Sequence, residues 1–149
     1  MPWLGSTSFA QVFALRPQLY ADYVAFAERI WSDGAVDPQL LELCRLLVAQ
    51  MLGCPSELRR RTPQAMTAGL SEARIAALSD WRRSTELSAA ERACLRFAQG
   101  FVLDPHGLTD ADAAAVAAHL SPPEMVALVE ALALFDGFTR FRLMLGVEG

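Results

Sequence analysis

Helix start signals recur along this sequence and constrain the fold more than any other feature. Ser88 and Glu91 have the spacing of a capping box, and Thr109 and Asp112 form its aspartate variant. Ser121 precedes two prolines and a glutamate, which is a third helix start. Between these signals the apolar residues recur at helical spacing, and no segment shows the two-residue alternation of a half-buried strand. The sequence therefore predicts an all-α fold.

The apolar spacing places the predicted helices along most of the chain. They cover residues 17–31, 38–52, 55–68, 71–78, 88–100, 110–119 and 122–145. Residues 1–15 lack the pattern and are predicted to form an extended N-terminal arm, whose Trp3, Phe9 and Phe13 pack on a neighbouring surface. Residues 16–149 are predicted to form one helical domain.

Composition excludes several classes of function. A chain of 149 residues that is 53% hydrophobic can bury a sizeable core. Its net charge of -4 argues against a nucleic-acid partner, which requires clustered positive charge. All basic residues are arginine, so Schiff-base chemistry on a lysine is excluded. No run of 18 apolar residues occurs, and the N-terminus does not have the pattern of a signal peptide, so no membrane association is expected.

The cysteines and histidines carry little further information. Cys44, Cys54 and Cys94 are odd in number and lack a disulfide-framework spacing, which predicts a cytoplasmic location. Cys44 and Cys94 lie in apolar helical stretches and are predicted to be core residues. His106 and His119 have no partners at a metal-ligand spacing, so no metal site is predicted. Phosphate loops, nucleophile elbows and dinucleotide fingerprints are absent, and no cofactor is expected.

The run from Glu42 to Arg61 has the arrangement of an active-site hairpin. One predicted helix ends at Gly53, Cys54 follows, and the next predicted helix begins at Pro55. If the two helices are antiparallel, Glu42 and Arg61 lie about 16 and 12 Å from the turn, so their side chains are predicted to meet. Such an ion pair would lower the pKa of Glu42. A purely structural salt bridge is the alternative interpretation.

Three sequence blocks resemble the alkylhydroperoxidase D (AhpD) and carboxymuconolactone decarboxylase superfamily. They read DPQLLELCRLLVAQMLGC, AGLSEARIAALSDWRRSTELSAAERACLRFAQ and LSPPEMVALVEALALFDGFTRFRLML. Together they extend from about residue 37 to residue 147. The resemblance implies an AhpD-like helical bundle with an antiparallel active-site hairpin. It also implies a homo-oligomer, either a trimer or a hexamer, with the hairpin near a subunit contact.

The resemblance also indicates what is missing. Redox-active members begin a Cys-x-x-Cys-x-x-x-His run at the position of Cys54 and carry a glutamate twelve residues earlier, where Glu42 stands here. The cysteine that usually attacks peroxide is replaced by Glu57, and the histidine that relays protons is replaced by Arg61. A position that is sometimes histidine is Ser56. The resemblance thus implies a degenerate peroxidase site without the dithiol.

Two of these residues have alternative interpretations. A helix N-terminus lowers the pKa of a thiol, so Cys54 could be reactive, or it could be a buried remnant of the family motif. Glu57 could be a carboxylate stabilised by the first turn of a helix. If instead it lies near Glu42 in an apolar pocket, one of the two would titrate high and act as acid or base.

The candidate functions follow from these residues. The catalytic candidates are Glu42, Cys54, Glu57 and Arg61, and the substrate-binding candidates are Ser56, Arg60 and Arg140. The preferred hypothesis is a cofactor-free role on a small organic, possibly acidic, molecule, with Arg61 binding substrate or setting charge. The alternatives are a non-catalytic oligomeric binding or scaffold protein and a one-cysteine alkylhydroperoxidase that uses Cys54.

Overall fold

The structure, a computed structural model, describes residues 2–149 and contains only helices and connecting loops in that range. The helices are α1 (Phe9–Phe13), α2 (Pro17–Ser32), α3 (Pro38–Leu52), α4 (Pro55–Arg59), α5 (Pro63–Thr67), α6 (Glu72–Ala76), α7 (Ala89–Leu103), α8 (Asp110–Ala117) and α9 (Pro122–Leu145), with short 3-10 helices η1 (Ala77–Asp80) and η2 (Pro105–Gly107). The predicted all-α fold is confirmed. No helix within residues 2–149 is long and apolar enough to cross a membrane.

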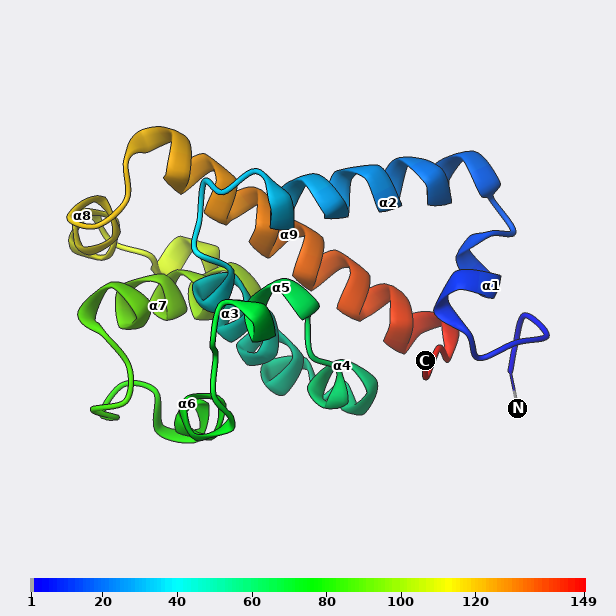
Figure 1. Cartoon of the computed structure of the whole chain (residues 1–149), viewed down its shortest axis with the longest axis horizontal. Helices are drawn as coiled ribbons and strands as arrows, with labels where there is room; N and C mark the ends of the chain where they lie inside the picture. The colour runs from blue at the N-terminus through cyan, green and yellow to red at the C-terminus, as the bar shows by residue number, and fades with distance from the viewer. Residues whose placement is uncertain (1) are drawn as a thin grey trace.

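Helix α3 lies at the centre of the molecule. It packs on both α7 and α9, and α4 and α5 fold back onto it. Figure 1 shows α9 running diagonally across the molecule, with α2 along one side of it and α3 on the other. Every residue from Leu40 to Ala49 is buried, so α3 is enclosed on all faces. Two of those residues, Glu42 and Arg45, are charged and must therefore find partners inside the protein.

The helix predicted over residues 55–68 is wrong in one respect, because it is divided into α4 and α5 by an extended segment. Arg60 has extended backbone angles, φ -73° and ψ 145°. Pro63 disfavours helical geometry at the residue before it. The extended segment also turns its backbone toward buried charges: the carbonyl of Arg60 accepts from Arg45, and the amide of Thr62 donates to Glu42. The break in the helix therefore supplies hydrogen bonds to α3.

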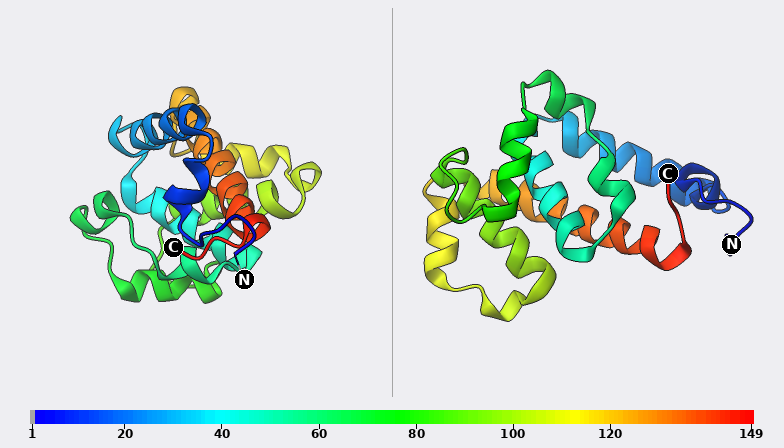
Figure 2. Two further views of the ribbon diagram at one scale, coloured as in Figure 1. Left: turned by 90° about the vertical axis from the view of Figure 1, so that its right-hand side faces the viewer. Right: turned by 90° about the horizontal axis from the view of Figure 1, so that it is seen from below.

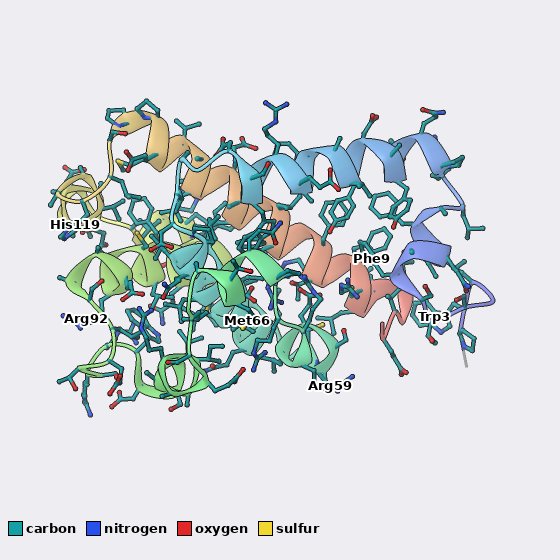
Figure 3. All side chains as sticks on the ribbon, in the orientation of Figure 1. Trp3, Phe9, Arg59, Met66, Arg92 and His119 are labelled. Carbon is teal, nitrogen blue, oxygen red and sulfur yellow. The ribbon has the colours of Figure 1, made fainter. Side chains whose placement is uncertain are left out.

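The predicted extended arm is also wrong, because it contains helix α1. The hydroxyl of Ser8 accepts from the backbone N–H of Gln11 and caps the helix. Folding the segment buries Phe9 and Phe13, whereas Trp3 remains 74% exposed. Figure 3 shows Phe9 beside the C-terminal half of α9 and Trp3 at the outer end of the molecule. The apolar rings thus pack on their own chain.

Aromatic rings join α1, α2 and the C-terminal half of α9. Phe9 and Phe13 stack or meet edge-on with Tyr23, Phe138 and Phe141, at centroid distances of 4.3–6.4 Å within the cluster. Such pairs stabilise a packed interface beyond the area they bury. The two α9 rings, Phe138 and Phe141, are therefore packed within the chain. The cluster fixes α9 where its last turns approach α4.

The chain ends lie together beside this aromatic cluster. The amides of Glu148 and Gly149 donate to the carbonyl of Thr7, and the amide of Phe9 donates to the carbonyl of Gly149. Figure 2 shows both termini at the same end of the molecule. Val147 is buried in the aromatic cluster, which anchors the segment after α9. This anchored segment forms one wall of the site described next.

Candidate functional site

The turn between α3 and α4 places Cys54. Helix α3 ends at Gly53, which has the left-handed angles φ 66° and ψ 49° that favour glycine. The amide of Cys54 then donates to the carbonyl of Ala49 at 3.0 Å, and Pro55 begins α4. The thiol of Cys54 lies 3.5 Å from the hydroxyl of Ser56. The predicted order of helix, glycine, cysteine and second helix is confirmed.

Glu42 is fully buried on α3, and both of its carboxylate oxygens are occupied. Oε1 accepts from Arg45 Nε at 2.5 Å and from the hydroxyl of Thr62 at 2.8 Å. Oε2 accepts from the backbone amide of Thr62 at 2.5 Å. Because Glu42 has no exposed surface, these contacts replace the water it loses on folding. The carboxylate therefore joins α3 to the segment that follows α4.

Arg45 is the centre of the buried charges. Its side chain is 1% exposed, and its Nη1 donates at 2.9 Å both to the carbonyl and to Oε2 of Glu57. Its Nη2 donates to the carbonyl of Arg60 at 2.7 Å. Together with the bond to Glu42, the planar guanidinium bonds two carboxylates and two carbonyls, a geometry for which arginine is suited and lysine is not.

The carboxylate of Glu57 pairs with arginines from three parts of the chain. Besides Arg45, it contacts Arg60 through both carboxylate oxygens, at 3.1 and 2.9 Å. Arg142 of α9 places its Nε 2.9 Å from Oε1. Burial raises the pKa of Glu57, but the hydrogen bond and charge of Arg60, with the charges of Arg45 and Arg142, outweigh burial and lower the pKa to about 2. Glu57 is therefore a carboxylate at any physiological pH.

These residues form what we call the buried charge network. Its members are Glu42, Arg45, Glu57, Arg60, Thr62 and Arg142. Three guanidinium groups face two carboxylates, so the network carries an excess positive charge. Tyr23 of α2 lies next to it: burial raises the pKa of its phenol, and the charges of Arg60 and Arg142 act in the opposite direction. The phenol therefore stays protonated at neutral pH.

A cavity opens where α4 meets the end of α9. Its volume is about 390 Å³, within the usual range for small-molecule sites. It is lined by Cys54, Pro55, Ser56, Arg59, Arg142, Leu143, Gly146, Val147 and Glu148. We call it the Cys54 cavity. Figure 3 shows Arg59 on α4, at the edge of the molecule.

Arg142 joins the buried charge network to the Cys54 cavity. Its residue is 8% exposed, and its guanidinium carbon lies 4.1 Å from the centre of the Phe9 ring. Its Nε forms an ion pair with the carboxylate of Glu57. Within residues 2–149, neither of its two amino groups has a hydrogen-bond partner, and Thr139 Oγ1 is the one buried side-chain polar atom left unbonded. Arg142 also lines the Cys54 cavity, so its amino groups are candidate donors to a molecule bound there.

Burial lowers the pKa of Arg142, and the charge of Arg60 lowers it further, while Glu57 acts in the opposite direction. A guanidinium nevertheless remains protonated in proteins. The cavity thus contains a partly desolvated cation beside a thiol.

Arg61 does not occupy the place that the sequence predicted. Its guanidinium binds Glu72 of α6 at 2.9 and 3.0 Å, and the predicted ion pair with Glu42 is wrong. The side chains of Arg61 and Glu72 are 27% and 70% exposed, so this is a surface pair. The break after α4 turns Arg61 outward, and Arg45, three residues after Glu42 on α3, pairs with Glu42 instead.

The remaining predicted residues divide between the two sites. Cys54 and Ser56 line the Cys54 cavity, whereas Glu42 and Glu57 belong to the buried charge network. The alternative in which one of two neighbouring carboxylates titrates high is wrong for Glu57. Arg60 belongs to the network, and its side chain is 45% exposed. Arg140 pairs with Asp136 on the surface of α9 and lies outside the cavity lining.

Sequence reasoning missed Arg45 and Arg142. Arg45 stands three residues after Glu42 in an otherwise apolar helix, and that spacing is a usable signal for a buried ion pair. Arg142 gives no comparable signal, because its partner Glu57 is distant in the sequence. The predicted substrate-binding residue Arg140 lies two residues before Arg142, on a different face of the same helix.

The other two cysteines are core residues, as predicted. Cys44 and Cys94 have no exposed surface. Burial raises the pKa of Cys44 well above its usual value, with further contributions from Cys94 and Glu91. Burial and the charge of Glu91 raise the pKa of Cys94 to about 12. Both thiols therefore stay protonated, and all three cysteines are free.

Solved structures share this fold. A protein of unknown function from Agrobacterium tumefaciens, proposed to be the antioxidant defence protein AhpD, gives a TM-score of 0.79 and 23% identity over 89% of this chain and 92% of that chain. The debrominase Bmp8 gives a TM-score of 0.81 and 16% identity over 93% of this chain and 74% of that chain. A cysteine-to-alanine variant of Bmp8 in complex with 2,3,4-tribromopyrrole gives 0.81 and 15% over the same shares.

The sequence comparisons agree with the fold. No curated protein sequence matches this chain. The model of the carboxymuconolactone decarboxylase family matches residues 17–100, which extend from the start of α2 into α7 and include Cys54 and most of the buried charge network. The match covers more than half of the chain. The protein therefore belongs to the carboxymuconolactone decarboxylase family.

Proposed function

We propose that this protein binds a small organic anion in the Cys54 cavity without the help of a cofactor. The observation that carries the proposal is Arg142, a buried arginine that lines the cavity and whose two amino groups have no hydrogen-bond partner in residues 2–149. An arginine in this setting suits a carboxylate, because two of its N–H groups match the two oxygens. The proposal keeps the acidic small molecule expected from the sequence and replaces Arg61 by Arg142.

The charges around the cavity support this ligand class. The buried charge network carries one excess positive charge, and Arg59 adds another at the exposed edge. Glu148 is the one carboxylate among the lining residues, and it comes from the segment after α9. Hydrogen bonds to a charged group contribute about 1.5–3 kcal/mol each, which is enough to favour a carboxylate over its neutral amide.

The same geometry argues against Glu42 and Glu57 as the acid or base of a reaction in the cavity. Both oxygens of Glu42 are occupied and Glu42 does not line the cavity, while Glu57 is held ionised by arginines. Cys54 and Ser56 are the lining residues whose side chains could react with a bound molecule. That Bmp8 holds a tribromopyrrole supports a small ring as the ligand body, with Leu143 and Val147 as apolar walls here.

Thermal unfolding in the presence of paired ligands tests the proposal. Small carboxylates such as benzoate are expected to raise the melting temperature of the wild-type protein, and the matched amides are expected not to, because only the anions pair with Arg142. The shift should be lost in Arg142→Gln and reduced in Arg59→Gln. Arg140→Gln is the control, since Arg140 lies outside the cavity.

Equal shifts with the acids and the amides would contradict the proposal. So would a carboxylate shift that survives in both cavity variants. Binding without any turnover of the bound acids would make the protein a non-catalytic binding protein. We further propose that the protein is cytoplasmic and forms a homo-oligomer, and light scattering of the purified protein tests the oligomeric state.

A second candidate, one-cysteine reduction of a hydroperoxide, is favoured by the position of Cys54, the one free cysteine that lines a cavity among residues 2–149. The thiol would take one oxygen from the hydroperoxide and become a sulfenic acid, releasing an alcohol. Two molecules of an external thiol would then restore it, giving water and a disulfide.

Mass spectrometry after brief peroxide treatment checks this candidate. Trapping with a sulfenic acid reagent is expected to label Cys54 and to leave the buried Cys44 and Cys94 unlabelled. The label should vanish in Cys54→Ser. If Cys54 stays unoxidised and the added peroxide is not consumed, the peroxidase candidate is excluded.

A further inference from the structure

We infer that Cys54 is a site of mixed-disulfide formation with small thiols that carry a carboxylate, and that Arg142 and Arg59 select for that carboxylate. The inference rests on the proposed anion binding in the Cys54 cavity and deepens it. It adds a covalent state of the same site, in which Cys54 is joined to a small thiol that carries a carboxylate. Occupying Cys54 in this way would fill the cavity and block other ligands.

Two independent observations combine at this place. Cys54 is 2% exposed and lines the cavity, whereas Cys44 and Cys94 have no exposed surface, so Cys54 is the thiol that a molecule in the cavity can contact. Arg142 lines the same cavity, is 8% exposed, and has two amino groups without a partner in residues 2–149. A thiol that shares a cavity with a partly desolvated cation favours reagents that are negatively charged.

The covalent step is a thiol–disulfide exchange. The deprotonated sulfur of Cys54 attacks one sulfur of a small disulfide, and a new S–S bond forms as the old one breaks. The departing thiolate leaves with the electron pair of the broken bond, and the proton of Cys54 passes to water. Cys54 is oxidised to a mixed disulfide and half of the small disulfide is reduced, so no further oxidant is required.

The cavity has room for the attached group. Its volume of about 390 Å³ holds a small ring or a short acid chain. Leu143 and Val147 offer apolar contact, and the hydroxyl of Ser56, 3.5 Å from the sulfur, is available to a polar group on the attached molecule. The carboxylate would then face the arginines at the two sides of the opening.

The test compares two disulfide probes on the folded protein. One is 5,5′-dithiobis(2-nitrobenzoic acid), which carries carboxylates, and the other is 4,4′-dithiodipyridine, which is neutral. Each reaction is followed by the absorbance of the released thiol. The ratio of the two reaction rates is compared between variants, because a change in the reactivity of the thiol itself affects both rates alike. Arg59→Gln and Arg142→Gln are each expected to lower this ratio by about three- to tenfold. Peptide mapping should find the label on Cys54 alone.

Arg140→Gln, on the same helix but outside the cavity, serves as the matched control and should keep the wild-type ratio. Arg59 is exposed, so Arg59→Gln keeps the test informative even if Arg142→Gln weakens the fold. Added salt should lower the ratio in the wild type more than in either variant, because exposed charges are screened.

The possible outcomes separate the two proposals. An unchanged ratio in both cavity variants, or labelling of the folded protein at Cys44 or Cys94, overturns the inference. The Cys54→Ser protein should still show the melting-temperature shift with benzoate, because reversible binding does not require the sulfur. If benzoate binds Cys54→Ser but the ratio is unchanged, the covalent inference fails and the proposed function stands. If benzoate binds neither the wild type nor Cys54→Ser, both the proposed function and the covalent inference fail.

Discussion

Replacing Arg45 with methionine is expected to lower the free energy of unfolding by about 3–5 kcal/mol, the cost of removing one partner from a buried ion pair. Methionine fills much of the same volume, so the loss comes from the partners that remain. Glu42 and Glu57 would be left without the guanidinium that joins them, and the carbonyls of Glu57 and Arg60 would lose their donors. Urea unfolding followed by circular dichroism measures the change.

The control for this substitution is Arg61→Gln, which removes an arginine from an exposed pair with Glu72. That change should leave the stability close to the wild type, because exposed ion pairs contribute little. The double variant Glu42→Gln with Arg45→Met should lose less stability than the sum of the two single variants, since they share one bond. Equal losses in Arg45→Met and Arg61→Gln would refute the buried charge network as the source of stability.

Replacing Glu57 with glutamine is expected to cost about 3 kcal/mol at neutral pH and to flatten the acid limb of the stability profile. The pKa of Glu57 is lowered from 4.5 to about 2 on folding. A carboxyl with a depressed pKa stabilises the folded state fully above its unfolded pKa. That contribution is lost as the pH falls from about 4.5 to about 2, where the folded protein also takes up the proton.

Urea titrations at a series of pH values between 7 and 2.5 check this expectation. The wild type should lose stability steeply below about pH 4.5, and the difference from Glu57→Gln should shrink over the same range. Glu72→Gln is the control, because Glu72 is exposed and its charge is screened by solvent. The account is wrong for Glu57 if the two glutamine variants show the same acid limb as the wild type.

The regular parts of the fold could be predicted from the sequence. The capping box at Ser88 and Glu91 and its variant at Thr109 and Asp112 both form, and α9 has the predicted bounds, 122–145. These features depend on residues within one turn of each other. The division of residues 55–68 and the helix at Phe9–Phe13 depend on distant partners, namely the buried charges of α3 and the rings of α9.

The candidate site was predictable only in part, for the same reason. The turn at Gly53 and the position of Cys54 follow from local signals. The choice of Arg61 as the partner of Glu42 assumed one straight helix after the turn. Once the chain becomes extended at Arg60, the spacing that supported that pair no longer holds. Helix α9, far along the chain, then supplies Arg142, which no local pattern could relate to Cys54.

We propose that Glu57, three residues after Cys54, is a permanently ionised carboxylate, so that any chemistry falls to the Cys54 cavity. Carbon NMR of the Glu57 carboxyl, assigned by comparison with Glu57→Gln, tests this claim most directly. We expect no titration of that signal between pH 8 and about pH 4, because the pKa of Glu57 is lowered to about 2. A midpoint above about pH 5 would make Glu57 a candidate acid or base and would contradict the account.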